Sequence, residues 1–149
     1  MNRSLFSLSV LLLTSASAFA QKSPVFVAEG AAIRGYDAVA YFKEGKALKG
    51  DSKFTYTWNG SDWRFANAED LALFKATPEK YAPQYGGYCA YGSADGEGHK
   101  APTDPQAWAI VDDKLYLNYN KKVQEAWKKD PKGMIGKADK NWPTLKDKE

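Results

Sequence analysis

A single cysteine and a single histidine carry most of the chemistry open to this sequence. Cys89 lies in residues 85–92, a segment rich in tyrosine and glycine, and His99 follows ten residues later in a second glycine-rich stretch. Thiolate and imidazole groups are ligands that suit copper and zinc. The two residues therefore predict a metal site, with copper or zinc as its ion.

Two ligands do not complete such a site, because structural zinc uses four protein ligands and catalytic zinc three. Met134, Asp95, Asp104 or a second chain would have to supply the others. Two alternatives remain open. Cys89 is a small buried hydrophobic residue and His99 a surface loop residue, or the thiol has a redox role or forms a disulfide with another chain.

Several tyrosines and one aspartate are candidates for lining a ligand pocket. Ligand sites are largely apolar with a few polar groups, and tyrosine offers an apolar ring with a polar tip. Packing of the same tyrosines on a hairpin is the alternative. The candidates are Tyr36, Asp37, Tyr85, Tyr88 and Tyr91.

Catalysis finds little support in the sequence. A nucleophilic cysteine needs a base, and His99 is the only imidazole. Asp37 and Asp104 are the acids most suited to carboxylate chemistry, but each also fits a cap or a turn. We therefore assign no catalytic residue and expect a binding protein. A thiol- or metal-dependent enzyme that uses Cys89 and His99 is one alternative, and an accessory module for protein interaction without metal is another.

The first twenty residues have the pattern of a signal peptide. Arg3 precedes the apolar run 5–13, and 18–20 has the small-x-small form of a cleavage site. Cleavage is expected between Ala20 and Gln21, which predicts a periplasmic or secreted protein. The apolar run is too short to span a bilayer, and no later segment predicts a transmembrane helix.

Length and charge limit the remaining possibilities. The chain of 149 residues suits one domain after the signal peptide. We divide it into a lead-in at 21–32, a domain at 33–142 and a tail at 143–149. A lone cysteine excludes an internal disulfide. Removal of Arg3 lowers the formal net charge from +3 to +2, which is too small to indicate nucleic-acid binding.

Two hairpins are the clearest local structures. Asn59-Gly60 is a strong signal for a two-residue type I′ turn, and it predicts that Tyr56 pairs with Trp63 and Phe54 with Phe65. A second hairpin over 108–117, turning at 112–113, pairs Ile110 with Leu115 and Trp108 with Leu117. Both hairpins place their large apolar residues on one face, which is typical of half-buried antiparallel strands.

Short helices are predicted around these hairpins. Asp37, Asn67, Asn120 and Asp130 occupy N-cap positions, and they predict helices at 38–42, at 68–75, from 121 to about 129, and after 130. We place Asp70 as the acid of a capping box and expect Gly133 and Gly136 to break the last helix. The chain is thus a small α+β domain, with antiparallel hairpins packed against short helices.

Four segments together resemble one known family. Residues 65–81 combine a strand that ends in an aromatic residue, a helix with an inward phenylalanine, and a following proline, lysine and tyrosine. Residues 35–42 read G-Y-D-A-V-A-Y-F, and 86–90 and 104–108 also contribute. These segments resemble the YHS domain, in particular the exported YHS-domain proteins of bacteria, and the resemblance covers 33–142.

This resemblance implies a binding role with metal, copper among the ions, because YHS modules occur on copper-transporting ATPases. Those modules carry one cysteine near their start and another just after the second strand. The present chain has Tyr36-Asp37-Ala38 at the first place and Ala66-Asn67 at the second. The metal ligands of the family are therefore not transferred to these positions, and Cys89 and His99 lie outside the core motif.

Overall fold

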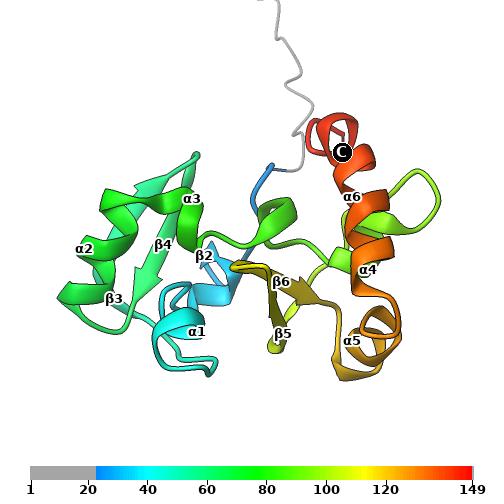
Figure 1. The fold of residues 1–149 in the computed structure, drawn as a ribbon. Coiled ribbons are helices and arrows are strands. Elements are labelled where there is room, and N and C mark those ends of the chain that lie inside the picture. Colours follow the sequence, from blue (N-terminus) through cyan, green and yellow to red (C-terminus); the bar gives the residue numbers. More distant parts are fainter. Residues whose placement is uncertain (1–22, 149) are drawn as a thin grey trace, which may run out of the picture.

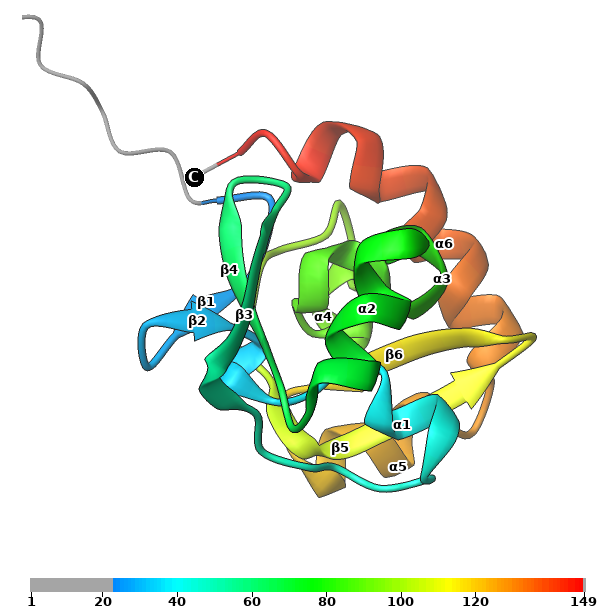
Figure 2. The same cartoon turned by 90° about the vertical axis from the view of Figure 1, so that its left-hand side faces the viewer.

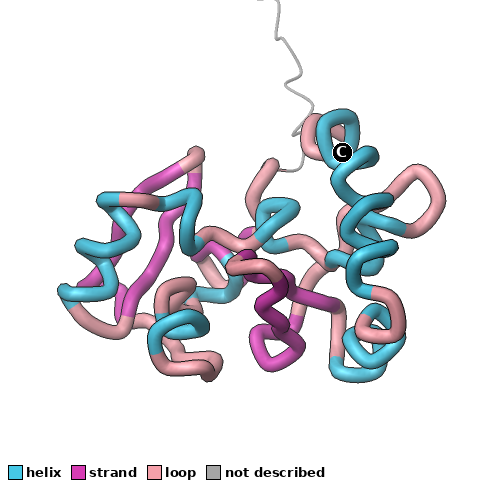
Figure 3. Tube along the Cα trace, in the orientation of Figure 1, coloured by secondary structure: helices cyan, strands magenta, loops and turns pink. Residues whose placement is uncertain are grey.

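The computed structural model describes residues 23–148, and it confirms the α+β class. Within that part of the chain, six α-helices surround three two-stranded antiparallel sheets (Figures 1 and 3). The strands are β1 (Val27–Ala28), β2 (Ala31–Ala32), β3 (Asp51–Trp58), β4 (Ser61–Phe65), β5 (Asp104–Val111) and β6 (Lys114–Asn118). The helices are α1 (Ala40–Lys43), α2 (Ala68–Ala76), α3 (Pro78–Tyr81), α4 (Ala90–Ala94), α5 (Lys121–Trp127) and α6 (Pro131–Leu145).

The first predicted hairpin is β3–β4. Its turn residues Asn59 and Gly60 both have positive φ, and Tyr56 pairs with Trp63 as predicted. The predicted pairing of Phe54 with Phe65 is wrong, because a bulge shifts the register and Phe65 faces Asp51 instead. A bulge adds a residue to one strand of the pair and bends that strand.

The second predicted hairpin, β5–β6, has the expected register over its turn-proximal half. Ile110 pairs with Leu115 and Trp108 with Leu117. This face packs into one core cluster, while Tyr116 and its neighbours on the opposite face pack into a second. The hairpin is thus buried on both sides, and Figure 1 shows it between the β3–β4 lobe and the α4–α6 lobe.

The lead-in is part of the folded domain. Its described residues, 23–32, include the β1–β2 hairpin, and a 3₁₀ turn, Ile33–Gly35, follows directly. Val25 is 1% exposed, and the Phe26 N–H donates a 2.8 Å hydrogen bond to the carbonyl of Gly86. This contact ties the start of the domain to its glycine-rich centre.

Helix α2 lies along the β3–β4 hairpin (Figure 2) and begins as predicted. The Asn67 side chain accepts a 2.8 Å hydrogen bond from the Asp70 N–H, which satisfies one free donor of the first turn. Phe74 is fully buried against the hairpin. The predicted helix at 38–42 is shorter and later than expected, since α1 begins at Ala40.

Helix α6 differs most from prediction. It continues through Gly133, Gly136 and Pro143 to Leu145, so the first residues of the predicted tail are helical. Asp130 caps it and Leu145 is 3% exposed, which shows that its end is packed. No helix in residues 23–148 has the length and apolar character needed to cross a membrane. The predicted signal peptide lies outside the described residues.

Candidate functional site

Cys89 is a buried cap of a helix that sequence reasoning did not predict. Its side chain is at the N-terminus of α4, where Sγ accepts a 3.5 Å hydrogen bond from the Gly92 N–H. The thiol also donates to Asn118 Oδ1 at 3.6 Å. Burial raises the pKa of Cys89, although nearby backbone N–H groups oppose that rise. The thiol form is therefore favoured over the thiolate that metals bind.

His99 lies close to the same helix but on the exposed side of its loop. The backbone N–H of His99 donates to the Gly92 carbonyl at 2.9 Å, and the ring Nε2 would be 3.1 Å from a Cβ placed on Gly92. Cys89 and His99 thus both contact Gly92, one from the interior and one from the exposed loop.

The further ligands that a metal would need are not gathered around this pair. Residues 23–148 contain no group of three or more His, Cys, Asp and Glu side chains that could hold an ion. Asp95 is exposed, Asp104 Oδ1 accepts a hydrogen bond from the Gln106 N–H, and Met134 packs against the second core cluster. The described donor set therefore does not fit a copper or zinc site within one chain.

The candidate tyrosines have separate roles. Tyr88 is buried and donates a 2.7 Å hydrogen bond to the Ser23 carbonyl, which holds the lead-in. Tyr91 is half-buried against the second core cluster. Tyr36 is half-buried and lies under the ammonium group of Lys49. Among the predicted pocket residues, Tyr85 is the one that lines the cleft described below.

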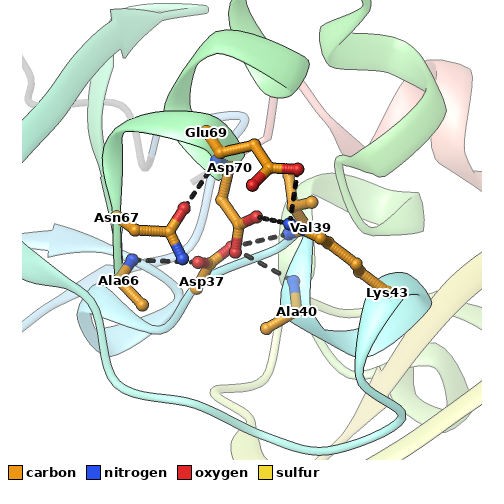
Figure 4. Close-up of polar contacts among 8 residues, drawn as sticks. All are labelled: Asp37, Val39, Ala40, Lys43, Ala66, Asn67, Glu69 and Asp70. Atoms are coloured by element: carbon orange, nitrogen blue, oxygen red, sulfur yellow. Dashed lines mark hydrogen bonds and ion pairs between the residues drawn. The ribbon is translucent and has the colours of Figure 1, made fainter.

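Asp37 is buried completely and its carboxyl group holds several backbone segments (Figure 4). Oδ1 accepts hydrogen bonds from the N–H groups of Val39 at 2.8 Å and Ala40 at 3.1 Å. Oδ2 accepts one from the Ala66 N–H at 2.9 Å. The residue thus fixes the start of α1 and joins it to the segment between β4 and α2.

A second buried carboxyl group, that of Asp70, lies beside that of Asp37 (Figure 4). Asp70 Oδ1 also accepts a 3.0 Å hydrogen bond from Lys43 Nζ, which forms an ion pair with Glu69 as well. Asp70 Oδ2 is buried and receives no hydrogen bond from any donor group in the described structure. Burial, followed by the neighbouring carboxyl group of Asp70, raises the pKa of Asp37 to about 7.

This pair differs from the sequence interpretation of both acids. Asp37 and Asp104 were the acids most suited to carboxylate chemistry, with a cap or a turn as the alternative for each. Asp104 binds the nearby Gln106 N–H, and the carboxyl group beside Asp37 is that of Asp70. Asp70 was expected to complete a capping box, and its carboxyl group instead points to Asp37 and Lys43. Both aspartates are 0% exposed, so neither carboxyl group faces solvent in this structure.

A large cleft lies between the end of the β3–β4 hairpin and α6. It has a volume of about 790 Å³. Trp58 and Trp63 line it from the hairpin, and Trp142 lines it from α6. Tyr85 also lines it, with its hydroxyl donating a 2.8 Å hydrogen bond to Asp139.

Polar groups of both signs surround these rings. The acids are Glu79, Asp139 and Asp147, and the bases are Lys114 and Lys146. Asn59 and Gln84 add amide groups that both donate and accept hydrogen bonds. Several aromatic faces with a few polar groups are typical of a small-molecule site.

Comparison with known proteins finds no relative of this chain. The chain matches no protein-family model, no curated protein and no solved structure. The resemblance to the YHS domain therefore stays a prediction, and the geometry of the cleft is the basis on which we propose a function.

Proposed function

We propose that this chain is an exported, non-catalytic protein of the YHS-domain type that binds a small organic ligand in the cleft between β3–β4 and α6. The observation that carries the proposal is the convergence of Trp58 and Trp142 on one cleft from two separate parts of the fold. Each is only half-buried, so each keeps apolar surface available to a ligand.

The size of the cleft supports a small ligand. Ligand pockets measure roughly 300–1,000 Å³, and the volume here is about 790 Å³. Part of the lining is built by ring packing. Trp58 packs on Phe74 with ring centroids 5.7 Å apart, and Trp142 packs on Tyr85 at 6.0 Å. These contacts hold the rings in place before a ligand arrives, which reduces the entropy lost on binding.

The charges around the cleft narrow the class of ligand. Three acids and two lysines line it, which leaves a formal charge of −1 and no cluster of one sign. A polyanion would meet the acids, and a polycation would meet the lysines. An uncharged or zwitterionic compound with a ring fits this mixture, because the ring can pack on tryptophan while its polar groups form hydrogen bonds.

Screening by nuclear magnetic resonance tests the proposal. The probes are mixtures of neutral sugars, aromatic amino acids and nucleosides, added to ¹⁵N-labelled mature protein. A ligand should shift the indole signals of Trp58 and Trp142 and the side-chain amide of Asn59. Trp58→Phe and Trp142→Phe should each weaken binding roughly tenfold, which corresponds to about 1.4 kcal/mol.

Trp108→Phe is the matched control. Trp108 is also half-buried and packs on Tyr41, but it does not line the cleft. It should bind the ligand like the unmodified protein. Shifts that map to another part of the surface, or equal losses in all three tryptophan variants, would place the site elsewhere and refute the proposal.

A further inference from the structure

We propose that Asp37 and Asp70 bind one proton between their carboxyl groups in the folded protein, and that release of this proton weakens the junction of α1 with α2. This inference is independent of the ligand cleft. It rests on the cluster of groups around the two acids, on their burial, and on one oxygen without a donor.

The two carboxyl groups lack one hydrogen-bond donor. Both oxygens of Asp37 accept backbone N–H groups, and Asp70 Oδ1 accepts from Lys43. Asp70 Oδ2 is left without a donor. A buried acceptor without a partner costs free energy, and a hydrogen on either carboxyl group forms the missing bond of the pair.

The charges around the two aspartates also favour one bound proton. Two ionised carboxylates in contact repel each other, and burial strengthens that repulsion. Lys43 is the cation that contacts the pair, and it is shared with Glu69, whose side chain is 73% exposed. From α1, the Tyr41 hydroxyl donates to the Pro105 carbonyl, and burial raises the pKa of Tyr41 further above its usual value. Tyr41 therefore stays uncharged and directs its hydrogen bond away from the pair.

A metal ion is a poorer occupant than a proton. The N–H groups of Val39, Ala40 and Ala66 already point at the Asp37 oxygens. The ammonium group of Lys43 is 3.0 Å from Asp70 Oδ1. A cation placed between the acids would be repelled by these donors. A proton is small enough to lie between two oxygens without displacing them.

The pair joins three segments that are separate in sequence. Asp37 contacts the backbone at the start of α1, Ala66 precedes α2, and Asp70 lies in the first turn of α2. When the proton leaves, two negative charges face each other at this junction. The expected consequence is a weaker attachment of α1 to α2, with unfolding made easier.

The direction of the pH effect follows from the two states. Asp37 has a pKa of about 7 when folded, against the ordinary value of 3.8. Between these values the folded protein holds a proton that the unfolded chain has lost. Stability should therefore fall as the pH rises from about 4 to about 7, and then stay level as far as this pair is concerned.

Urea unfolding across that pH range tests the inference with Asp70→Asn. The asparagine amide can donate to Asp37 in place of the shared proton, so the pKa of Asp37 should fall back toward its ordinary value and this position should contribute less pH dependence. The urea midpoint of the unmodified protein should fall with rising pH relative to that of Asp70→Asn. Glu97→Gln, which removes an exposed acid from a loop, should follow the unmodified protein. The same fall in Asp70→Asn as in the unmodified protein would overturn the inference.

A second measurement needs no variant. The side-chain carboxyl carbons of ¹³C-labelled aspartates report protonation directly in the folded protein. We expect the carboxyl carbon of Asp37 to titrate close to neutral pH. If it titrates below pH 5, the shared proton does not exist at physiological pH and the proposal is wrong.

Discussion

The rings of Trp63 and Phe74 pack with their centroids 5.1 Å apart, and this contact joins the β3–β4 hairpin to α2. Phe74 also packs against Tyr56, Trp58 and Phe65. One side chain of α2 is therefore the centre of the aromatic cluster behind the hairpin wall of the cleft.

Phe74→Ala should destabilise the protein strongly, because it removes a ring that is 0% exposed and leaves a cavity. The expected cost is about 3–5 kcal/mol in the free energy of unfolding, measured by urea denaturation. Ala72→Gln on the exposed face of the same helix should change stability by less than about 0.5 kcal/mol. A small effect of Phe74→Ala would mean that the hairpin and α2 do not share a core.

Gly86→Ala should be more damaging than Gly96→Ala. Both glycines have positive φ, 63° and 58°, so both alanines cost about 1–2 kcal/mol of backbone strain. A Cβ at Gly86 would also clash with the Pro24 carbonyl, whereas one at Gly96 meets nothing within 4 Å. We expect a further cost of about 1–3 kcal/mol for Gly86→Ala. Equal unfolding free energies of the two variants would show that the lead-in is not docked there.

The Cys89 thiol should react slowly with a thiol reagent in the folded protein. It is 2% exposed, so the reagent has little access to the sulfur. Burial also raises its pKa, which lowers the fraction of reactive thiolate. Absorbance after addition of an aromatic disulfide reagent measures the rate, and urea-unfolded protein is the control. Rapid labelling under native conditions would contradict the buried geometry.

Dialysis against copper(I) or zinc tests the metal prediction made from Cys89 and His99. Uptake of one ion per chain or per dimer that is lost in Cys89→Ser and weakened in His99→Ala would support it. Such uptake should release protons and weaken as pH falls, because the ligand must be a thiolate. If the unmodified protein takes up no ion, Cys89 is a packing and capping residue.

Lys100→Met should loosen the end of α6. The Lys100 ammonium group donates to the carbonyls of Lys146 and Lys148 at 2.8 and 2.7 Å. A cation at a helix C-terminus contributes about 0.3–1 kcal/mol, and up to about 2 kcal/mol when partly buried. Hydrogen exchange at the amides of Lys146 and Lys148 should become faster. Lys140→Met, on the exposed side of α6, should leave those amides protected.

Local patterns in the sequence predicted local structure well. Asn59-Gly60 has the positive φ values that its turn needs, and Asn67 and Asn120 cap α2 and α5. These elements depend on residues within four or five positions of one another. The sequence therefore contained the information that determines them.

Features that depend on distant segments were predicted poorly. The proximity of Asp37 and Asp70 follows from the docking of α1 against α2, which no local pattern expresses. Helix α6 continues past two glycines and a proline, because packing against α4 and the second core cluster outweighs their low helix propensity. Among the residues that line the cleft, Tyr85 was predicted from the sequence as a pocket residue. The other walls come from the hairpin and α6, which lie far apart in the sequence.

Strand pairing in this fold is local, whereas the contacts between hairpins are distant in sequence, so the two should form at different rates. All the described sheets are hairpins, and isolated hairpins close in about 1–10 μs. The contacts that join them, such as Phe26 to Gly86 and Tyr41 to Pro105, span much longer stretches of chain. Closing those loops is entropically expensive, so assembly of the hairpins, rather than strand pairing, should limit the folding rate.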